Sequence, residues 1–430
     1  MRYTLLLSIF LLFACTGKKT TEENAAPENK GPQVINLEEA ISQPSETVPL
    51  SEAVRELRIV PLETTAESLV GNVQSIQIMG DDIFVLDLQS GILRFSKDGK
   101  FLNKIGTRGQ GPGEYVWPKG LLTNEKAGLI GIQESNDQAD MVKWYSLDGK
   151  FVREQPAEKQ RMFLGMNGYF FNFQDKFMAV DKLAFLVGNI EGNKNHTKYW
   201  SLALLDSAFN VQKEYMNPDF IRNEQDIRDN IFSGRMENHY AEEGPFISVF
   251  GDKLNVLYYQ GDTIYRYQDT TQDFAPEYIL NVGSKASFAE SHRFYNKEQS
   301  FFNLLCVHAL YQTEKYLYFQ ATRSSNGYTI AYNKADGTMK VHEYETELKE
   351  ITFPANSALV LRVYTDRILY LQNDLVGGDF SVDYASSGKY WISILDSDKL
   401  EDFEATSPEL LSILEKRKVD DNPILLIGVL

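Results

Sequence analysis

The most unusual local sequence in this chain is the glycine-rich octapeptide Arg108–Tyr115, RGQGPGEY. Its three glycines allow backbone amides to approach a ligand closely. Four side chains add hydrogen-bond donors and acceptors: Arg108, Gln110, Glu114 and Tyr115. The same glycines also suit a tight crossover between two strands, pinned by an ion pair between Arg108 and Glu114. We favour the crossover and keep ligand binding by these four residues as the alternative. The octapeptide is no P-loop, because no Gly-Lys-Ser/Thr ending follows it.

Aromatic residues offer a second kind of binding site, because exposed rings stack on sugars and peptides. Rings concentrate near expected strand ends in three places: GYFFNF (168–173), KYW (198–200) and YAEEGPF (240–246). Most are expected to fill the core. Trp117 and Tyr240 are the two that we predict as exposed ligand-binding residues.

Signatures of catalysis and of metal binding are missing from the sequence. The five histidines are scattered, with no HExxH motif and no pair at i, i+4. No GxSxG elbow indicates a serine hydrolase. Asp81, Asp82 and Asp87 could suggest calcium, but they fall at turns and strand ends, where capping is favoured. We therefore predict no catalytic residue, no metal and no cofactor.

Composition narrows the class of protein. The chain has 430 residues, of which 43% are hydrophobic and 12% aromatic, and this favours a folded domain rich in strands. Its net charge is −17, and no Lys/Arg cluster interrupts that acidity. A nucleic-acid partner is excluded, because phosphate binding needs clustered positive charge.

The N-terminus has the pattern of an export signal. An apolar run from Leu5 to Ala14 is too short to span a bilayer and ends at Cys15. Leu12–Cys15 resembles a bacterial lipobox, which implies cleavage before Cys15 and acylation of its thiol. We expect a signal peptide over 1–14, a flexible tether over 15–50 and anchoring to outer-membrane lipid, on the periplasmic or the surface face. Only Cys306 remains, so no disulfide is expected within the chain.

A turn motif recurs along the rest of the chain. FSKDGKF at Phe95–Phe101 returns as YSLDGKF at Tyr145–Phe151, and three looser copies start at Leu204, Tyr265 and Tyr332. Each copy has a strand, a polar turn and another strand, at intervals that grow from 50 to roughly 60–70 residues. Such repeats are typical of β-propeller blades, each of four short antiparallel strands. The longer intervals need insertions, which we place at 218–239 and 284–303 and expect to be mostly helical or irregular.

The two ends of the chain supply a sixth blade. Inner strands are predicted at Leu359–Gln372 and Lys389–Asp396. A helix is predicted to follow, with Ser407 as its N-cap and Pro408 at its first position, and to end near Lys418. The closing sequence ILLIGVL then pairs with Leu57–Leu62, which joins the chain ends and removes an exposed sheet edge. The sequence thus predicts an all-β, six-bladed propeller over 51–430, as a monomeric domain.

Several segments resemble a family of six-bladed β-propeller lipoproteins of Bacteroidetes. The matching residues are Val60–Thr65 (VPLETT), Ser68–Ile76, Asp81–Asp87, Phe95–Tyr115 and Asp420–Leu430. The resemblance implies a fold, an exported lipid-anchored state and recognition at the cell envelope, and it implies no common activity.

Three functions remain open. We favour a binding module without catalysis, whose ligand is a glycan, a peptide or an envelope protein. The alternatives are a propeller lyase or hydrolase, with carboxylates or a metal at the central channel, and an accessory subunit of an envelope complex. The side chains on the innermost strand of each blade distinguish the binding module from the enzyme. Converging histidines and carboxylates would favour the enzyme, and aromatic and neutral polar side chains would favour binding.

Overall fold

The computed structural model describes residues 31–135, 140–156, 169–180, 183–185, 201–223, 241–243, 245–285, 303–353, 356–364 and 368–430. All elements named below belong to one compact unit, Pro32–Leu430. Within the described ranges, no helix has both the length and the apolar character needed to cross a membrane.

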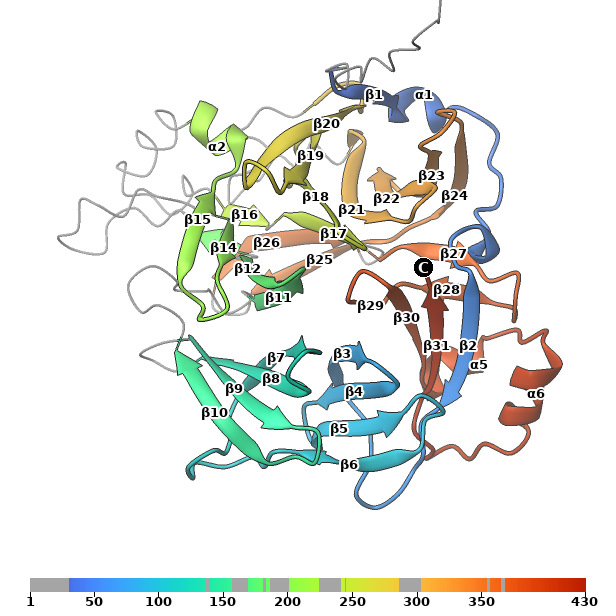
Figure 1. Ribbon diagram of the computed structural model, residues 1–430. Coiled ribbons are helices and arrows are strands. Elements are labelled where there is room, and N and C mark those ends of the chain that lie inside the picture. Colours follow the sequence, from blue (N-terminus) through green and yellow to red (C-terminus); the bar gives the residue numbers. More distant parts are fainter. Residues whose placement is uncertain are drawn as a thin grey trace, which may run out of the picture. The chain divides into compact units, whose positions relative to one another are not determined.

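Six four-stranded antiparallel sheets form the blades of a propeller (Figure 1). Blade 1 contains β3 (Val73–Met79), β4 (Asp82–Asp87), β5 (Gly91–Ser96) and β6 (Phe101–Ile105). Blade 2 contains β7 (Pro118–Asn124), β8 (Leu129–Ser135), β9 (Asp140–Ser146) and β10 (Phe151–Pro156). Blade 3 contains β11 (Tyr169–Phe173), β12 (Lys176–Val180), β14 (Leu202–Leu205) and β15 (Val211–Tyr215).

The second half of the chain forms the other three blades. Blade 4 contains β17 (Phe246–Phe250), β18 (Lys253–Leu257), β19 (Thr263–Gln268) and β20 (Asp273–Asn281). Blade 5 contains β21 (Cys306–Gln312), β22 (Tyr316–Arg323), β23 (Asn326–Asn333) and β24 (Met339–Glu345). Blade 6 contains β29 (Tyr384–Ser386), β30 (Tyr390–Leu395), β31 (Ile424–Val429) and β2 (Glu56–Pro61). The predicted six-bladed fold is confirmed.

Smaller elements connect or flank the blades. Three two-stranded pairs are β13 (Leu183–Phe185) with β16 (Ala241–Glu243), β25 (Leu348–Phe353) with β26 (Asn356–Tyr364), and β27 (Tyr370–Gln372) with β28 (Asp379–Ser381). The predicted inner strand at Leu359–Gln372 is therefore wrong. Its residues fall in β26 and β27, and the innermost strand of blade 6 is β29. Strand periodicity identifies a strand but not its partner, which explains the error.

Four short α-helices occur in the described part of the chain. α1 is discussed below, and α2 (Pro218–Arg222), α5 (Ser397–Glu401) and α6 (Pro408–Leu414) follow it. The predicted cap of α6 is present, because Ser407 Oγ accepts a hydrogen bond from the Leu410 amide at 3.2 Å. The helix ends four residues before Lys418. The two predicted insertions fall largely outside the described residues, apart from α2.

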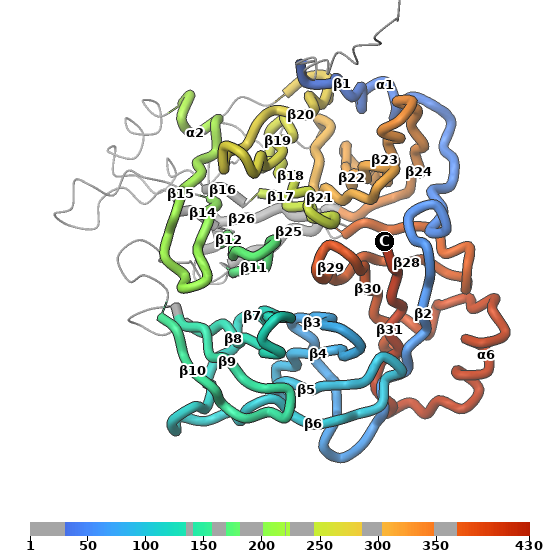
Figure 2. Tube along the Cα trace, viewed as in Figure 1, coloured from blue at the N-terminus to red at the C-terminus, as the bar shows by residue number. Residues whose placement is uncertain are grey.

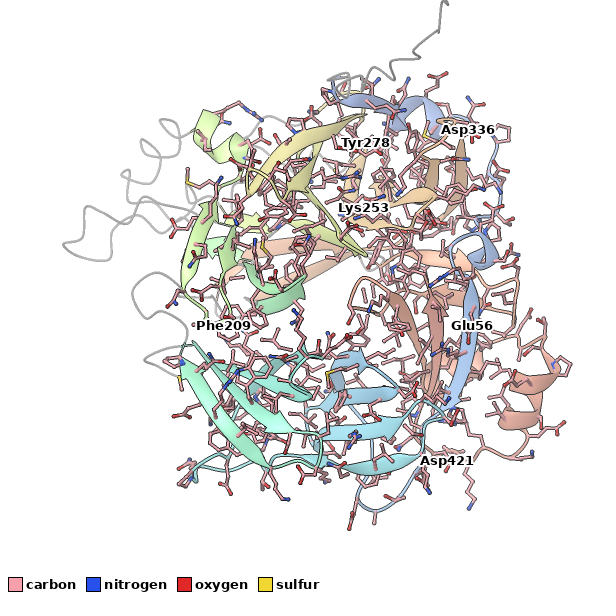
Figure 3. The ribbon with its side chains drawn as sticks, viewed as in Figure 1. Glu56, Phe209, Lys253, Tyr278, Asp336 and Asp421 are labelled. Atoms are coloured by element: carbon pink, nitrogen blue, oxygen red, sulfur yellow. The ribbon has the colours of Figure 1, made fainter. Side chains whose placement is uncertain are left out.

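Each pair of neighbouring blades shares its own hydrophobic core, and six such cores follow one another around the ring. In β4, Ile83 and Val85 pack toward blade 6, whereas Phe84 and Leu86 pack toward blade 2. Successive strand residues face opposite sides, so a middle strand between two blades is apolar on both faces. Aromatic rings fill these layers (Figure 3), and Phe209 is one of them, fully buried between blades 2 and 3.

The repeated Asp-Gly turn is the point where a blade touches the blade before it. Gly99 and Gly149 both have positive φ, +83° and +87°. The Gly99 carbonyl accepts a hydrogen bond from the Glu63 amide at 2.8 Å, and the Gly149 carbonyl accepts one from the Gly106 amide at 3.0 Å. A Cβ on Gly99 would overlap the carbonyl oxygen of Pro61. Glycine at these turns therefore satisfies both a backbone conformation and a close approach.

The two ends of the chain meet in blade 6, as predicted. β2 pairs antiparallel with β31, from Glu56 opposite Val429 to Pro61 opposite Ile424. Just before β31, the buried Asn422 carboxamide donates to the carbonyls of Glu63 and Ser68 at 2.9 and 2.7 Å and accepts from the Val70 amide at 2.8 Å. One side chain thus holds the crossover from blade 6 to blade 1.

The unit that contains the blades begins at Pro32, earlier than the residue 51 that we expected (Figure 2). β1 (Gln33–Asn36) pairs in parallel with β20 as a fifth strand of blade 4, and α1 (Leu37–Ala40) follows. The Glu46 amide then donates to Val341 in blade 5, and the 3-10 helix η1 (Leu50–Glu52) precedes β2. The sequence of this segment is mainly polar, so it was expected to be a flexible tether. Its few apolar side chains, such as the fully buried Leu37 and Leu50, hold it against the blades.

Candidate functional site

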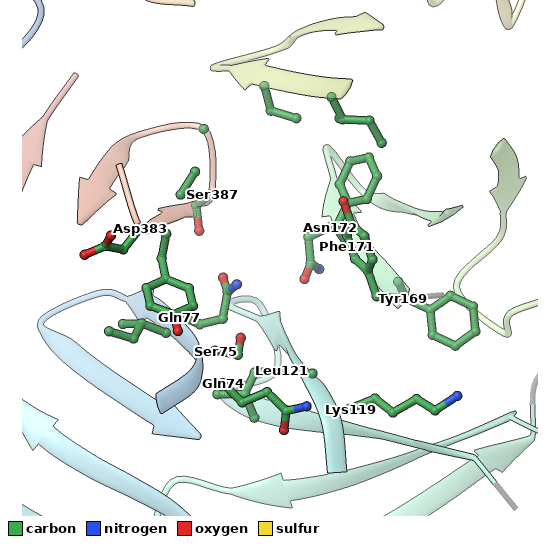
Figure 4. Close-up of a pocket in the computed structure, with 18 residues that line it drawn as sticks. Gln74, Ser75, Gln77, Lys119, Leu121, Tyr169, Phe171, Asn172, Asp383 and Ser387 are labelled. Atoms are coloured by element: carbon green, nitrogen blue, oxygen red, sulfur yellow. The ribbon is translucent and has the colours of Figure 1, made fainter. Parts of the chain in front are cut away.

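The innermost strands of five blades surround a cavity of about 780 Å³ at the centre of the ring (Figure 4). β3, β7, β11 and β17 contribute, together with β29 and its flanking residues. Its lining is Gln74, Ser75, Ile76, Gln77, Lys119, Gly120, Leu121, Tyr169, Phe170, Phe171, Asn172, Ile247, Val249, Asp383, Tyr384, Ala385, Ser387 and Gly388. The volume falls within the range of small-molecule sites.

Neutral polar groups and aromatic rings dominate this lining. The lining holds three carboxamides (Gln74, Gln77 and Asn172), and Ser75 and Ser387 add hydroxyls. Both polar atoms of the Asn172 carboxamide are bonded to the Thr123 backbone. Burial raises the pKa of the Tyr169 phenol to about 12. Burial, with the nearby Asp383 charge, raises the pKa of Tyr384 to about 12. Both phenols are therefore neutral at physiological pH, and the Tyr384 hydroxyl already donates to the Val73 carbonyl at 2.8 Å.

Among the described lining residues, Asp383 is the single carboxylate, and it is already bonded. Its Oδ2 forms an ion pair with Lys399 Nζ at 2.8 Å and accepts a hydrogen bond from the Ile394 amide, also at 2.8 Å. A carboxylate that is paired in this way is held in place and is poorly suited to abstract a proton. In the part of the chain that the structure describes, no histidine lines the cavity.

Side chains from neighbouring blades cap the open edges of the innermost strands. The Phe170 amide donates to Gln133 Oε1 at 2.8 Å, and the Ile78 amide donates to Ser386 Oγ at 2.9 Å. Gln312 Nε2 donates to the Ser248 carbonyl at 2.8 Å. An innermost strand has a sheet partner on one side only, so its other edge needs such partners when it is buried.

The RGQGPGEY residues form a crossover between β6 and β7 and do not line the cavity. Arg108 Nη1 donates to the Leu88 carbonyl at 2.7 Å, and Glu114 Oε2 accepts from the Gly111 amide at 2.7 Å. In the described contacts, each charge meets a backbone group and no ion pair between the two occurs. Gln110 is exposed.

Tyr115 and Trp117 have opposite surroundings. Tyr115 is 2% exposed and packs edge-on against Tyr145, while its hydroxyl accepts from the Ile92 amide at 3.3 Å. The ring therefore belongs to the core between blades 1 and 2. Trp117 is 73% exposed and precedes β7, whose Lys119 lines the cavity. Tyr240 and Cys15 lie outside the described residues.

Sequence reasoning missed the residues that line the cavity. Gln74, Gln77 and Asn172 lie in ordinary strand sequences, with no motif around them. The available signal is a polar side chain in the first strand of a blade, where apolar residues are otherwise expected. Of the described residues, no three His, Cys, Asp or Glu lie together in a group that could hold a metal.

Comparison with known proteins identifies related folds. A family model, Domain of unknown function (DUF4934), matches residues 32–428. No curated protein matches the chain. A crystal structure described as an exported protein of Bacteroides fragilis has 18% identity and a TM-score of 0.57, and the match covers 93% of this chain and 100% of that one.

Two further solved structures are more distant. A member of the DUF4221 family from Bacteroides vulgatus has 10% identity and a TM-score of 0.44, over 88% of this chain and 97% of that one. The extracellular domain of a hybrid two-component system from B. thetaiotaomicron has 11% identity and a TM-score of 0.39, over 87% of this chain and 43% of that one.

Proposed function

We propose that this chain, which belongs to the family Domain of unknown function (DUF4934), binds an uncharged carbohydrate in its central cavity without transforming it. The observation that carries the proposal is the lining of the cavity. Carboxamides, hydroxyls and neutral phenols surround it, together with Phe171. Sugars offer many hydroxyls that both donate and accept, and they offer apolar C–H faces to aromatic rings.

The same lining argues against glycoside hydrolysis. Hydrolysis by the usual routes needs two carboxyl groups on opposite sides of the bond that breaks. Among the described residues, the lining offers one carboxylate, Asp383, which is paired with Lys399. A binding site for a neutral ligand needs neither an acid nor a base, so it fits the cavity better.

We also propose that the protein is exported and held at the outer membrane by acylated Cys15. The apolar run before Cys15 and the lipobox-like Leu12–Cys15 support this location. The B. fragilis structure, described as an exported protein, is consistent with it. A carbohydrate ligand also suits the cell envelope, where glycans are accessible.

A glycan array probed with the full chain, purified in detergent, tests the binding function. Gln74 is exposed in the cavity, and its side chain has no hydrogen bond in the described structure. Gln74→Ala should therefore weaken glycan binding roughly 5- to 10-fold, the effect of losing one hydrogen bond, and leave stability unchanged. The matched control is Gln110→Ala, the same change at an exposed site outside the cavity.

A bulkier residue in the cavity wall provides a second variant. A Cβ on Gly120 would meet only Gln133 Oε1, at 3.8 Å, so a side chain fits there without a backbone clash. Gly120→Leu should block binding while the fold is retained. If no glycan binds, or if both cavity variants bind like the wild type, the proposal is wrong. A peptide array and mass spectrometry of bound glycans then test peptide binding and cleavage.

A further inference from the structure

We infer that Trp117 is an aromatic platform for a second sugar ring, so that the protein binds an oligosaccharide that extends from the central cavity onto the surface beside β7. This inference rests on the proposed carbohydrate function and specifies its ligand. It concerns a residue outside the cavity lining, and it depends on the exposure, the support and the position of Trp117.

The exposure of Trp117 is unusual in this molecule. Among the described aromatic side chains, only Trp117 and Phe151 are exposed, at 73% and 42%. The Phe151 ring lies edge-on to Tyr145 and covers Gly113, so it has a packing role. The Trp117 indole makes no hydrogen bond and no ring contact in the described structure. A large apolar ring that is left in water, in a protein that buries nearly all its other described rings, is available to stack on a ligand.

A buried ion pair supports the backbone from which the indole projects. Glu134 is 7% exposed, and its Oε1 accepts hydrogen bonds from the Val116 amide and from the Trp117 amide, the latter at 3.1 Å. Its Oε2 pairs with Lys143 Nζ at 2.8 Å. Lys143 also donates to the carbonyl of Glu114. Both ends of the Glu114–Trp117 segment are thus fixed.

Fixing an exposed aromatic residue favours binding. A platform that is already in place loses little conformational freedom when a ligand stacks on it. The next residue, Pro118, restricts the backbone further, because proline fixes its own φ and limits the residue before it. The buried Glu134 and Lys143 charges hold this platform more rigidly than an ordinary loop would.

Trp117 is close enough to the cavity for one ligand to reach both. Pro118 begins β7, and Lys119, two residues after Trp117, lines the cavity. Two extended residues span about 7 Å between Cα atoms. One oligosaccharide can therefore place one ring in the cavity and a neighbouring ring on the indole.

A glycan array that carries each sugar as a series from monosaccharide to hexasaccharide tests the platform. The full chain in detergent is compared with Trp117→Ala and Trp117→Phe. Trp117→Ala should lose roughly 3- to 10-fold in affinity for the longer members and nothing for the monosaccharide, because the lost stacking contact contributes about 0.65–1.4 kcal/mol. Trp117→Phe should restore most of the loss. Leu102→Ala, at an exposed apolar residue of β6, is the matched control and should bind like the wild type.

Oxidation of exposed tryptophan by N-bromosuccinimide, followed by peptide mass spectrometry, gives a readout that needs no variant. A bound hexasaccharide should protect Trp117, and the monosaccharide should not. Equal loss of binding at every length, or no loss at any length, would overturn the platform while leaving the cavity function standing. Failure of the wild type to bind any glycan would instead remove the proposed function.

Discussion

The carboxamide of Asn172 forms two hydrogen bonds with the backbone of Thr123 in the neighbouring blade. The Thr123 amide donates to Oδ1 at 3.0 Å, and Nδ2 donates to the Thr123 carbonyl at 2.7 Å. Asn172 therefore pairs with backbone groups at the open edge of β7, as a neighbouring strand would. Because Asn172 also lines the cavity, the joint between blades 2 and 3 is part of the candidate site (Figure 4).

Replacing Asn172 should destabilise the ring in proportion to the hydrogen bonds that are lost. Asn172→Leu leaves both Thr123 groups unpaired and should lower the free energy of unfolding by about 2–3 kcal/mol. Asn172→Asp keeps the acceptor for the Thr123 amide but sets a carboxylate against its carbonyl, so its effect should lie between Leu and wild type above the pKa of the new side chain. Denaturant unfolding measures the order, and equal stability of all three proteins would contradict it.

The Asp-Gly turns offer a test of the contact between blades. Gly99→Ala should lower the free energy of unfolding by about 3 kcal/mol, because it combines a positive φ with overlap against the Pro61 carbonyl. Gly80→Ala is the matched control, since Gly80 also has a positive φ, +61°, but open space around it. It should cost only about 1 kcal/mol. Thermal unfolding measures both, and similar losses would show that the blade contact contributes little.

Asn422 should be the most sensitive single residue of the ring closure. Its carboxamide satisfies three backbone groups, so Asn422→Ala should lower the free energy of unfolding by about 3 kcal/mol. Asp420→Ala, at an exposed residue two positions earlier, should have little effect. Removing Pro423–Leu430 should unfold the whole domain, since blade 6 would lose β31. An unchanged melting transition of the truncated chain would be incompatible with closure of the ring at blade 6.

The N-terminal segment should be held to the ring in a pH-dependent way. Burial opposes ionisation of Glu52, but hydrogen bonds from Lys340 and Tyr316 hold the pKa of its carboxyl below the usual value. Such a group stabilises the fold above the pKa of the unfolded chain, and this stability is lost as the pH falls through the folded pKa.

Glu52→Gln should therefore lower the melting temperature at pH 7, and its difference from the wild type should close below about pH 4. The exposed Glu67→Gln serves as the control and should show no difference at either pH. A gap that is constant from pH 7 to pH 3 would mean that the Glu52 charge contributes nothing.

Membrane attachment depends on Cys15. Cys15→Ser should release the protein from the membrane fraction of cells, because the acyl chains would have no thiol to which they attach. Cys306→Ser is the matched control, since Cys306 is a buried thiol in β21 and should leave fractionation unchanged. Retention of Cys15→Ser at the membrane would refute the lipid anchor.

The sequence by itself determined the repeated unit and the way in which the ring closes. Both are local or nearly local properties. The Asp-Gly turns at Gly99 and Gly149 depend on four or five adjacent residues, and the apolar ILLIGVL strand needs a partner that Leu57–Leu62 provides. Alternation along β4 likewise reflects the two cores that it must fill.

Only the tertiary structure decided which residues line the cavity. Gln74, Asn172 and Asp383 are far apart in the sequence, and no motif surrounds any of them. They come together in the cavity only because three blades place them there. The tertiary structure also gave opposite exposures to Tyr115 and Trp117, two aromatic residues that are close in the sequence. Burial depends on what the rest of the chain places beside a residue. A local pattern could therefore identify both rings as candidate ligand-binding residues, but it could not show which one faces water.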